Sequence, residues 1–255
     1  MEYLTKIKYF YRNRAAIENA YGSIIYQLLN ANISMIKLKE SNFKINIEDD
    51  ASLYIIDEIF FQEVYKTNLF DIEKNDLIID IGANIGVFSL YASQFTNNDI
   101  FAFEPVSSSF KILQKNVSQN GVKNIKPVNK GVTKKSGINK IKTVSESGGH
   151  SMYFDNIDDN YEKVVTTKLE EVITKNNIDQ IGVLKMDCEG CEGDVIDSLD
   201  IDHLKIIRKI VMEFHDNVSC LDNEEIRQKL EKSGFHCETL KTKNSPFGYI
   251  FAYRS

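Results

Sequence analysis

The sequence predicts an α/β fold in which a parallel sheet carries helices on both faces, the doubly wound arrangement. From Asp76 onward, short apolar segments alternate with segments whose apolar residues recur at helical spacing. The first apolar segment, Leu77–Ile79, is continuously apolar, which is typical of a parallel strand covered on both faces. It runs directly into a turn bracketed by Gly82 and Gly86. Strands that alternate with helices in this way indicate a parallel sheet.

The residues before this sheet are predicted to form an extension that packs on the main domain. Residues 1–32 resemble a helical segment, and the strict alternation of Phe43–Ile47 predicts a half-exposed strand. The apolar and aromatic run Leu53–Tyr65 predicts a helix. We therefore divide the chain into a helical and strand extension, residues 1–68, and a main domain, residues 69–255.

The remaining elements follow in chain order. Apolar runs predict five further strands, at Ile100–Phe103, Val183–Asp187, Lys209–Phe214, Phe235–Lys241 and Tyr249–Tyr253. Helical spacing follows the glycine turn, and Ser107 can cap a second helix that ends at Asn120. Asp222 and Glu225 form a capping box for a last helix, which stops at Gly234.

Composition limits the class of protein. The 255 residues are 42% hydrophobic and 27% charged, which is typical of a soluble globular domain with a full core. A net charge of −6 argues against general affinity for nucleic acid, which requires a basic face. Four cysteines do not indicate a disulfide scaffold, and we find no signal peptide or membrane-spanning stretch. We expect a reduced, cytoplasmic enzyme or binding protein.

The glycine turn indicates the ligand, because doubly wound sheets bind ligands at the carboxyl ends of their strands. A dinucleotide site needs a glycine where Asn84 stands, and Asp80 would repel a phosphate but suits an ammonium group. Glu104 ends the next strand and is placed to accept hydrogen bonds from ribose hydroxyls. S-adenosylmethionine carries both an ammonium group and ribose hydroxyls, and it has no phosphate. The alternative is a sharp turn that needs glycine for its geometry alone.

Four segments in the same order resemble the FkbM-type methyltransferases: Asp80–Gly86, Phe103–Pro105, Leu184–Glu192 and Met212–His215. The resemblance spans Leu53–Tyr253. It implies transfer of a methyl group from S-adenosylmethionine to hydroxyl groups of sugars or polyketides. It also implies a Rossmann-like sheet of seven strands with the last one antiparallel.

The resemblance implies a set of donor-binding positions at the ends of the first strands. They are Asp80, Gly82, Asn84, Gly86, Glu104, Pro105, Asn129 and Gly131. Residues 129–131 are an ordinary version of the family's adenine-side segment. Cys188 and Cys191 depart from the small apolar residues that the family usually has there.

The Cys188-Glu189-Gly190-Cys191 stretch could be a redox pair or half of a zinc site. A zinc site needs a second pair of ligands, and Cys220 and Cys237 are isolated in the sequence. Cysteine also serves as a small buried hydrophobic residue. We favour this last interpretation.

Methyl transfer requires an acceptor oxygen held in line with the methyl group and a group that takes its proton. Candidates gather at the ends of two adjacent strands: Lys185, Asp187, Glu189, Glu213 and His215. His215 or Asp187 could be the base. A divalent metal on Asp187 and Glu213 is another option, but no third carboxylate is clearly placed, so we favour a metal-free site. Alternatively, Lys185 pairs with Glu213 and the set only anchors the donor's amino acid.

A further histidine lies in the segment Ser145–Met152, after the third strand. Gly148 and Gly149 make this segment mobile, so His150 could act as a lid residue or as the base. An ordinary surface loop explains the same residues.

Together these observations predict an O-methyltransferase that uses S-adenosylmethionine and a small acceptor. The family suggests that the acceptor is a sugar or nucleotide-linked sugar for a capsule or another surface glycan. We expect no nucleic acid or membrane partner, and the chain could form a homo-oligomer. Three alternatives remain. Asn84 disfavours a nicotinamide-dependent oxidoreductase, and the acidic balance disfavours a nucleic-acid methyltransferase. The third is a donor-binding scaffold without catalysis.

Overall fold

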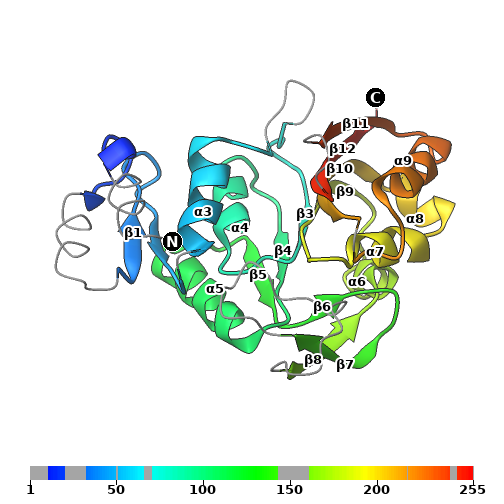
Figure 1. Ribbon diagram of the computed structural model, residues 1–255, viewed down its shortest axis with the longest axis horizontal. Helices are drawn as coiled ribbons and strands as arrows, with labels where there is room; N and C mark the ends of the chain where they lie inside the picture. The colour runs from blue at the N-terminus through cyan, green and yellow to red at the C-terminus, as the bar shows by residue number, and fades with distance from the viewer. Residues whose placement is uncertain are drawn as a thin grey trace.

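The computed structural model describes residues 11–20, 33–49, 51–65, 71–142, 161–216, 218–241 and 246–254 (Figure 1). A seven-stranded sheet in the order β11-β12-β10-β9-β3-β4-β5 forms its centre. The strands are β3 (Ile78–Ile81), β4 (Ile100–Phe103), β5 (Ile125–Val128), β9 (Ile181–Met186), β10 (Ile207–His215), β11 (His236–Lys241) and β12 (Phe247–Tyr253). β12 pairs antiparallel with β10 and with β11, whereas β3, β4, β5, β9 and β10 pair in parallel. The predicted seven strands with an antiparallel last strand are confirmed.

Helices cover both faces of this sheet, as the alternation of side chains requires (Figure 1). Ile78 faces a core shared with α3 (Ala51–Ile56), α4 (Val87–Ala92) and α5 (Ser107–Gln119). Ile79 and Ile81 face the opposite core, shared with α6 (Leu169–Lys175), α7 (Glu192–Ser198), α8 (Ile201–Lys205) and α9 (Asn223–Lys232). The doubly wound arrangement is therefore present. None of the described helices is long and apolar enough to cross a membrane.

The capping signals were right for one helix and wrong for another. The Asp222 side chain accepts from the Glu225 backbone N–H at 2.9 Å, and the Glu225 side chain accepts from the Asp222 N–H at 3.0 Å. α9 ends before Gly234, which has φ +91°. Ser107, in contrast, is the first residue of α5 and caps nothing, because its hydroxyl donates to Glu162 instead.

The residues before the sheet form a small β-hairpin and a helix that pack on the main core. β1 (Met35–Lys37) and β2 (Lys44–Asn46) pair antiparallel, which confirms the predicted strand. The predicted helix after it is α3, which continues as one π-helical segment, η1 (Asp57–Phe61). Residues 11–20 are mostly turns rather than the expected helix. Apolar side chains of β2 and α3 join the α4 and α5 core, while the domain boundary at residue 68 stays a prediction.

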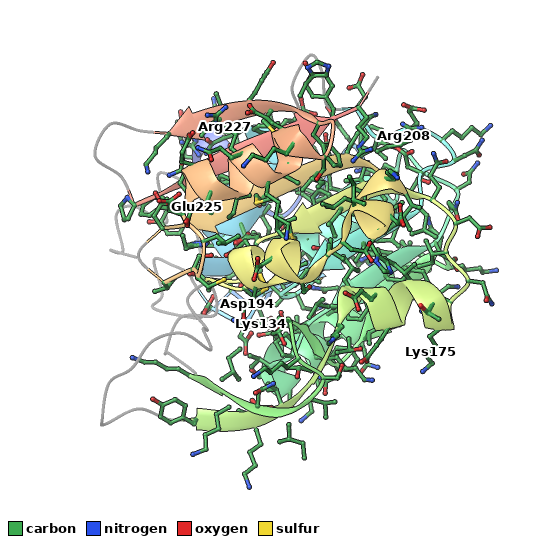
Figure 2. All side chains as sticks on the ribbon, turned by 90° about the vertical axis from the view of Figure 1, so that its right-hand side faces the viewer. Lys134, Lys175, Asp194, Arg208, Glu225 and Arg227 are labelled. Carbon is green, nitrogen blue, oxygen red and sulfur yellow. A yellow bond between two sulfur atoms is a disulfide. The ribbon has the colours of Figure 1, made fainter. Side chains whose placement is uncertain are left out.

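A second sheet of three strands follows β5 and was not predicted. It consists of β6 (Gly131–Val132), β7 (Gly137–Lys142) and β8 (Tyr161–Thr167) in the order β6-β8-β7. Lys134, between β6 and β7, pairs with Asp194 of α7 at 2.6 Å, which ties this sheet to the main domain (Figure 2). His150 and the segment Ser145–Met152 lie outside the described residues.

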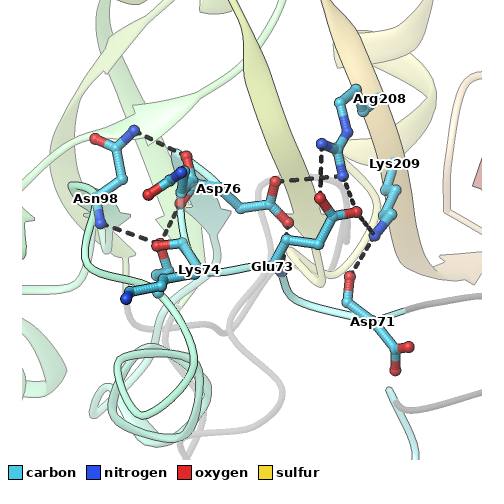
Figure 3. A network of polar contacts seen from close by, with 9 residues as sticks. Asp71, Glu73, Lys74, Asp76, Asn98, Arg208 and Lys209 are labelled. Atoms are coloured by element: carbon cyan, nitrogen blue, oxygen red, sulfur yellow. Dashed lines mark hydrogen bonds and ion pairs between the residues drawn. The ribbon is translucent and has the colours of Figure 1, made fainter.

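A polar network joins the amino ends of β3 and β10 (Figure 3). Arg208 pairs with Glu73 and lies 3.4 Å from the Asp76 carboxylate. Lys209 contacts the same Glu73 carboxylate at 3.1 Å and the Asp71 carbonyl oxygen at 2.5 Å. This network lies at the amino ends of the strands, and the site described next lies at the opposite, carboxyl ends.

Candidate active site

A cavity of ≈ 260 Å³ lies at the carboxyl ends of β3, β4, β9 and β10. Most of the predicted site residues line it: Gly82, Asn84, Glu104, Pro105, Gly131, Lys185, Asp187, Glu189 and Glu213. Four predicted site residues that the structure describes do not line the cavity: Asp80, Gly86, Asn129 and His215. Each of them contacts a residue that lines the cavity or is next to one in the chain. The prediction that the candidates converge at the strand ends is therefore met for the described residues.

The turn after β3 brings the backbone of two strand ends into close contact. Gly82 has φ +76°, and a Cβ atom there would lie 1.8 Å from the Asp187 carbonyl oxygen. Gly86 has φ +88°, and a Cβ atom there would lie 2.4 Å from a methyl group of Leu113. Asn84 adopts φ +50°, a conformation that asparagine tolerates better than most residues. Geometry alone thus requires both glycines, and the turn also forms part of the cavity wall.

Below this turn, a buried ion pair joins β3 to β9. Asp80 is completely buried, accepts from the Ser89 hydroxyl at 2.6 Å and lies 3.2 Å from the Lys185 ammonium. Lys185 also donates to the Gly82 carbonyl oxygen at 3.1 Å. Burial acts to lower the pKa of Lys185, but the charges of Asp80 and Asp187 outweigh burial and raise it. Lys185 is therefore a charged structural group rather than a base.

This ion pair corrects two expectations. Lys185 pairs with Asp80, and at a longer distance of 3.8 Å with Asp187, rather than with Glu213. Asp80 is fully buried, so its carboxylate does not face the cavity as a contact for an ammonium group would. Its physical role is to balance Lys185 and to hold the turn.

Glu104 occupies the end of β4 and is almost fully buried. One carboxylate oxygen accepts from the Asn84 N–H and the other from the Val106 N–H, both at 2.8 Å. Burial raises the pKa of Glu104 to about 7, although these two hydrogen bonds oppose the rise. The Asn129 side chain donates to the Glu104 and Pro105 carbonyl oxygens at 2.9 and 3.0 Å. Each Glu104 oxygen keeps a lone pair for a further donor.

The other half of the cavity is acidic. Asp187, Glu189 and Glu213 line it together with Glu58 of η1, which the sequence analysis missed. Burial and the neighbouring Asp187 raise the pKa of Glu213 to about 8, and burial raises that of Glu189 to about 7. The Tyr65 hydroxyl donates to Asp187 at 3.2 Å. We call Glu58, Asp187, Glu189 and Glu213 the acidic half of the cavity.

His215 lies behind the acidic half, between two carboxylates. Its Nε2 is 3.4 Å from Glu189, and its Nδ1 is 3.4 Å from Glu192. Burial acts to lower the pKa of His215, but Glu192 and Glu189 outweigh burial and raise it to about 9. At neutral pH the ring is therefore an imidazolium, which disfavours the proposed role of His215 as general base.

The turn between β9 and α7 differs from the expectation for its cysteines. Cys188 and Cys191 form a disulfide, so the interpretation as separate small hydrophobic residues was wrong, and neither of these two sulfur atoms is a thiolate that could bind zinc. Glu192 is completely buried, and its carboxylate accepts from the Cys188 and Gly190 N–H groups at 2.9 and 3.0 Å. The sequence motif contained Glu192, but nothing local distinguished it from the exposed glutamates.

Residues 80–237 match the family model of the methyltransferase FkbM domain. The chain belongs to the FkbM methyltransferase family. It is 28% identical to 31-O-demethyl-FK506 methyltransferase FkbM of Streptomyces tacrolimicus, over 64% of this chain and 74% of that protein. It is 24% identical to hexuronic acid methyltransferase AglP of Haloferax volcanii, over 71% of this chain and 72% of that protein.

A solved structure supports the same fold. The crystal structure of methyltransferase FkbM from Methylobacillus flagellatus KT aligns with a TM-score of 0.52 at 14% identity, covering 81% of this chain and 56% of that one. At this identity the likeness shows the fold alone. FkbM family membership confirms the resemblance, makes the chain a methyltransferase and implies S-adenosylmethionine as its methyl donor. The oxidoreductase alternative is thereby removed.

Proposed function

We propose that this FkbM-family chain methylates a hydroxyl group of a sugar or nucleotide-linked sugar. The carrying observation is that one cavity joins Glu104 and the glycine turn to the acidic half. A donor held at the first end places its methyl group toward carboxylates that can hold a hydroxylated acceptor. From the composition we propose that the reaction takes place in the cytoplasm, and from the family resemblance that it serves a capsule or another surface glycan.

The donor half has the features that a zwitterionic nucleoside requires. Gly82 lets the backbone turn closely at the end of β3, and Glu104 offers lone pairs at the end of β4 where ribose hydroxyls can donate. Asn129 fixes the segment that leads to Gly131 in the cavity wall. The donor supplies an activated methyl group, so the protein's task is to position the two reactants.

The acidic half has the features that a polyhydroxylated acceptor requires. Asp187, Glu189 and Glu213 can accept hydrogen bonds from several hydroxyl groups, and one of these carboxylates can take the proton of the reacting hydroxyl. The names of two relatives, which mention a hexuronic acid and an O-demethyl compound, support an oxygen acceptor.

The test is a transfer assay with S-adenosylmethionine and a panel of nucleotide-linked sugars and uronic acids, with product detected by mass spectrometry. Asp187→Asn keeps the size of the side chain but removes a carboxylate, so we expect turnover to fall by about 10²–10⁴-fold. Affinity for the donor, measured by calorimetry, should change far less. The matched control is Asp202→Asn, because Asp202 is an exposed residue of α8 that pairs with Lys205.

Two results would reject the proposal. Donor binding without turnover on any hydroxylated acceptor would leave the scaffold alternative. A fall in turnover that only follows lost donor affinity would place Asp187 in the donor site.

A further inference from the structure

The ends of β9 and β10 bring three potential metal ligands together. One ligand atom each from Asp187, Glu213 and His215 lies within 4.8 Å of the other two. An ion about 2.1 Å from each atom requires separations of about 3 to 4 Å, so the side chains would close by about 1 Å. We propose that Asp187, Glu213 and His215 bind a divalent cation, Mg²⁺ or Mn²⁺, in the acidic half of the cavity.

The backbone makes this arrangement rigid. β9 and β10 are adjacent parallel strands in which Met212 pairs with Met186, so that Glu213 lies beside Asp187. The period of two residues places the side chains of Glu213 and His215 on the same face of β10. The three residues therefore lie at, or directly after, the ends of two paired strands rather than on independent loops.

His215 is held in the manner of a ligating histidine. The residue is only 8% exposed, and its buried Nδ1 lies 3.4 Å from the Glu192 carboxylate, an ion-pair contact longer than a normal hydrogen bond. Glu192 is itself fully buried and fixed by two backbone N–H groups. A carboxylate behind a histidine ring is the usual outer support of metal-binding histidines. With Nδ1 next to Glu192, the Nε2 atom of His215 faces Glu189, which lines the cavity.

The charge of the site favours a cation. Four carboxylates line the acidic half, from Glu58, Asp187, Glu189 and Glu213. Among the described residues, the cavity wall contains one lysine, Lys185. Its ammonium group is already paired with the buried Asp80. On binding, a divalent ion would displace the protons that His215 and Glu213 hold at neutral pH and would offset the negative charge of the carboxylates at close range.

The cation also defines the acceptor, and this step rests on the proposed function. Mg²⁺ and Mn²⁺ take about six ligands, so three protein atoms leave about three positions. An acceptor with two adjacent oxygens, a vicinal diol or a hydroxy acid, can fill two of them. The hydroxyl proton then passes to a neighbouring carboxylate such as Glu189. The hydroxyl oxygen forms a bond to the methyl carbon, and the carbon–sulfur bond breaks with its electron pair going to sulfur.

Metal binding is measured directly, on the full chain treated with EDTA and then titrated with Mn²⁺ alone while the free-ion signal is followed by electron paramagnetic resonance. We expect one Mn²⁺ per chain, displaced by Mg²⁺. Asp187→Asn and Glu213→Gln should lose this binding, and Glu192→Gln should weaken it about 10- to 100-fold because it releases the His215 ring. Asp202→Asn is the matched control, since Asp202 is an exposed residue of α8 that pairs with Lys205.

The outcomes separate this proposal from the proposed function. No stoichiometric Mn²⁺ binding, or equal binding by wild type and Asp187→Asn, would overturn the cation site even if methyl transfer proceeds. Mn²⁺ binding with the expected pattern of variants supports the site even if no sugar in the panel is methylated. If turnover is detected, it should stop with EDTA and return with Mg²⁺, with acceptors that carry adjacent oxygens preferred, and full turnover in EDTA would overturn the cation's role.

Discussion

Glu104→Gln is the sharpest test of the donor half. The wild-type carboxylate accepts one backbone N–H on each oxygen, from Asn84 and Val106, both at 2.8 Å. Glutamine has a single acceptor oxygen, so its amide nitrogen would face one of these N–H groups as a second donor. The variant keeps the volume of the side chain and removes its charge and one acceptor.

The magnitude follows from these contacts. A hydrogen bond to a charged group contributes about 1.5–3 kcal/mol. Loss of one such bond from a ribose hydroxyl should weaken binding of the donor by about 10- to 150-fold. Loss of the bond to the turn costs about 1.5–3 kcal/mol of unfolding free energy, which is offset at a pH where Glu104 is ionised because glutamine removes the cost of burying its charge.

The pH dependence gives a second signature. Burial raises the pKa of folded Glu104 from 4.5 to about 7, so the folded chain holds this proton more tightly than the unfolded chain. Its contribution to stability is therefore complete below pH 4.5 and is lost as the pH rises through about 7, a change of about 3 kcal/mol. Donor affinity should move the other way, since hydroxyl donors favour the ionised carboxylate. It should rise as the pH passes through about 7 in wild type and stay flat in Glu104→Gln.

The assay is calorimetry with S-adenosylmethionine across this pH range, with urea unfolding of the same samples. Glu238→Gln on β11 is the matched control, because it makes the same substitution at an exposed residue. Equal donor affinity and an equal pH slope in wild type and Glu104→Gln would refute the assignment of Glu104 to the ribose.

Two further substitutions test the structural frame of the site. Gly82→Ala places a Cβ atom 1.8 Å from the Asp187 carbonyl oxygen at φ +76°, so it should abolish donor binding and lower the urea midpoint. The control is Gly121→Ala, where φ is +66° and no atom lies within 4 Å, so only the backbone conformation costs about 1–2 kcal/mol. The urea midpoint should fall further in Gly82→Ala than in this control. Equal losses would contradict the close approach. Lys185→Met leaves Asp80 buried without its cation and should cost about 3–5 kcal/mol of unfolding free energy, most of it recovered by adding Asp80→Asn. A double variant as unstable as the single one would contradict the ion pair.

The main sheet could be predicted because its strands are buried on both faces. Leu77–Ile79 is a continuous apolar run, Val183–Met186 is apolar apart from Lys185, and the structure places β3 and β9 there. β5 is less visible in the sequence because Pro127 interrupts it, and β7 is largely exposed, so neither has a clear apolar pattern. The π-helical η1 depends on how the extension packs on α4, which no local pattern specifies.

The convergence of candidate residues on one cavity could be predicted because parallel strands end at one edge of the sheet. Glu104 and Asp187 line that cavity, whereas Asp80 is buried and does not line it. The rule does not say which side chains pair, since that depends on register, and Asp80 lies directly opposite Lys185. Glu58 could not be found, because it reaches the cavity from the extension.

Glu192 shows most clearly what local sequence leaves open. A glutamate in the first turn of a helix is expected to be exposed and to interact with the helix dipole. Here it is completely buried, and one carboxylate binds the Cys188–Cys191 turn and faces the ring of His215. The position of Glu189 in that turn and the orientation of His215 therefore depend on the same group. A substitution of Glu192 should therefore change the positions of both Glu189 and His215. A substitution of Glu189 or of His215 changes only one of the two.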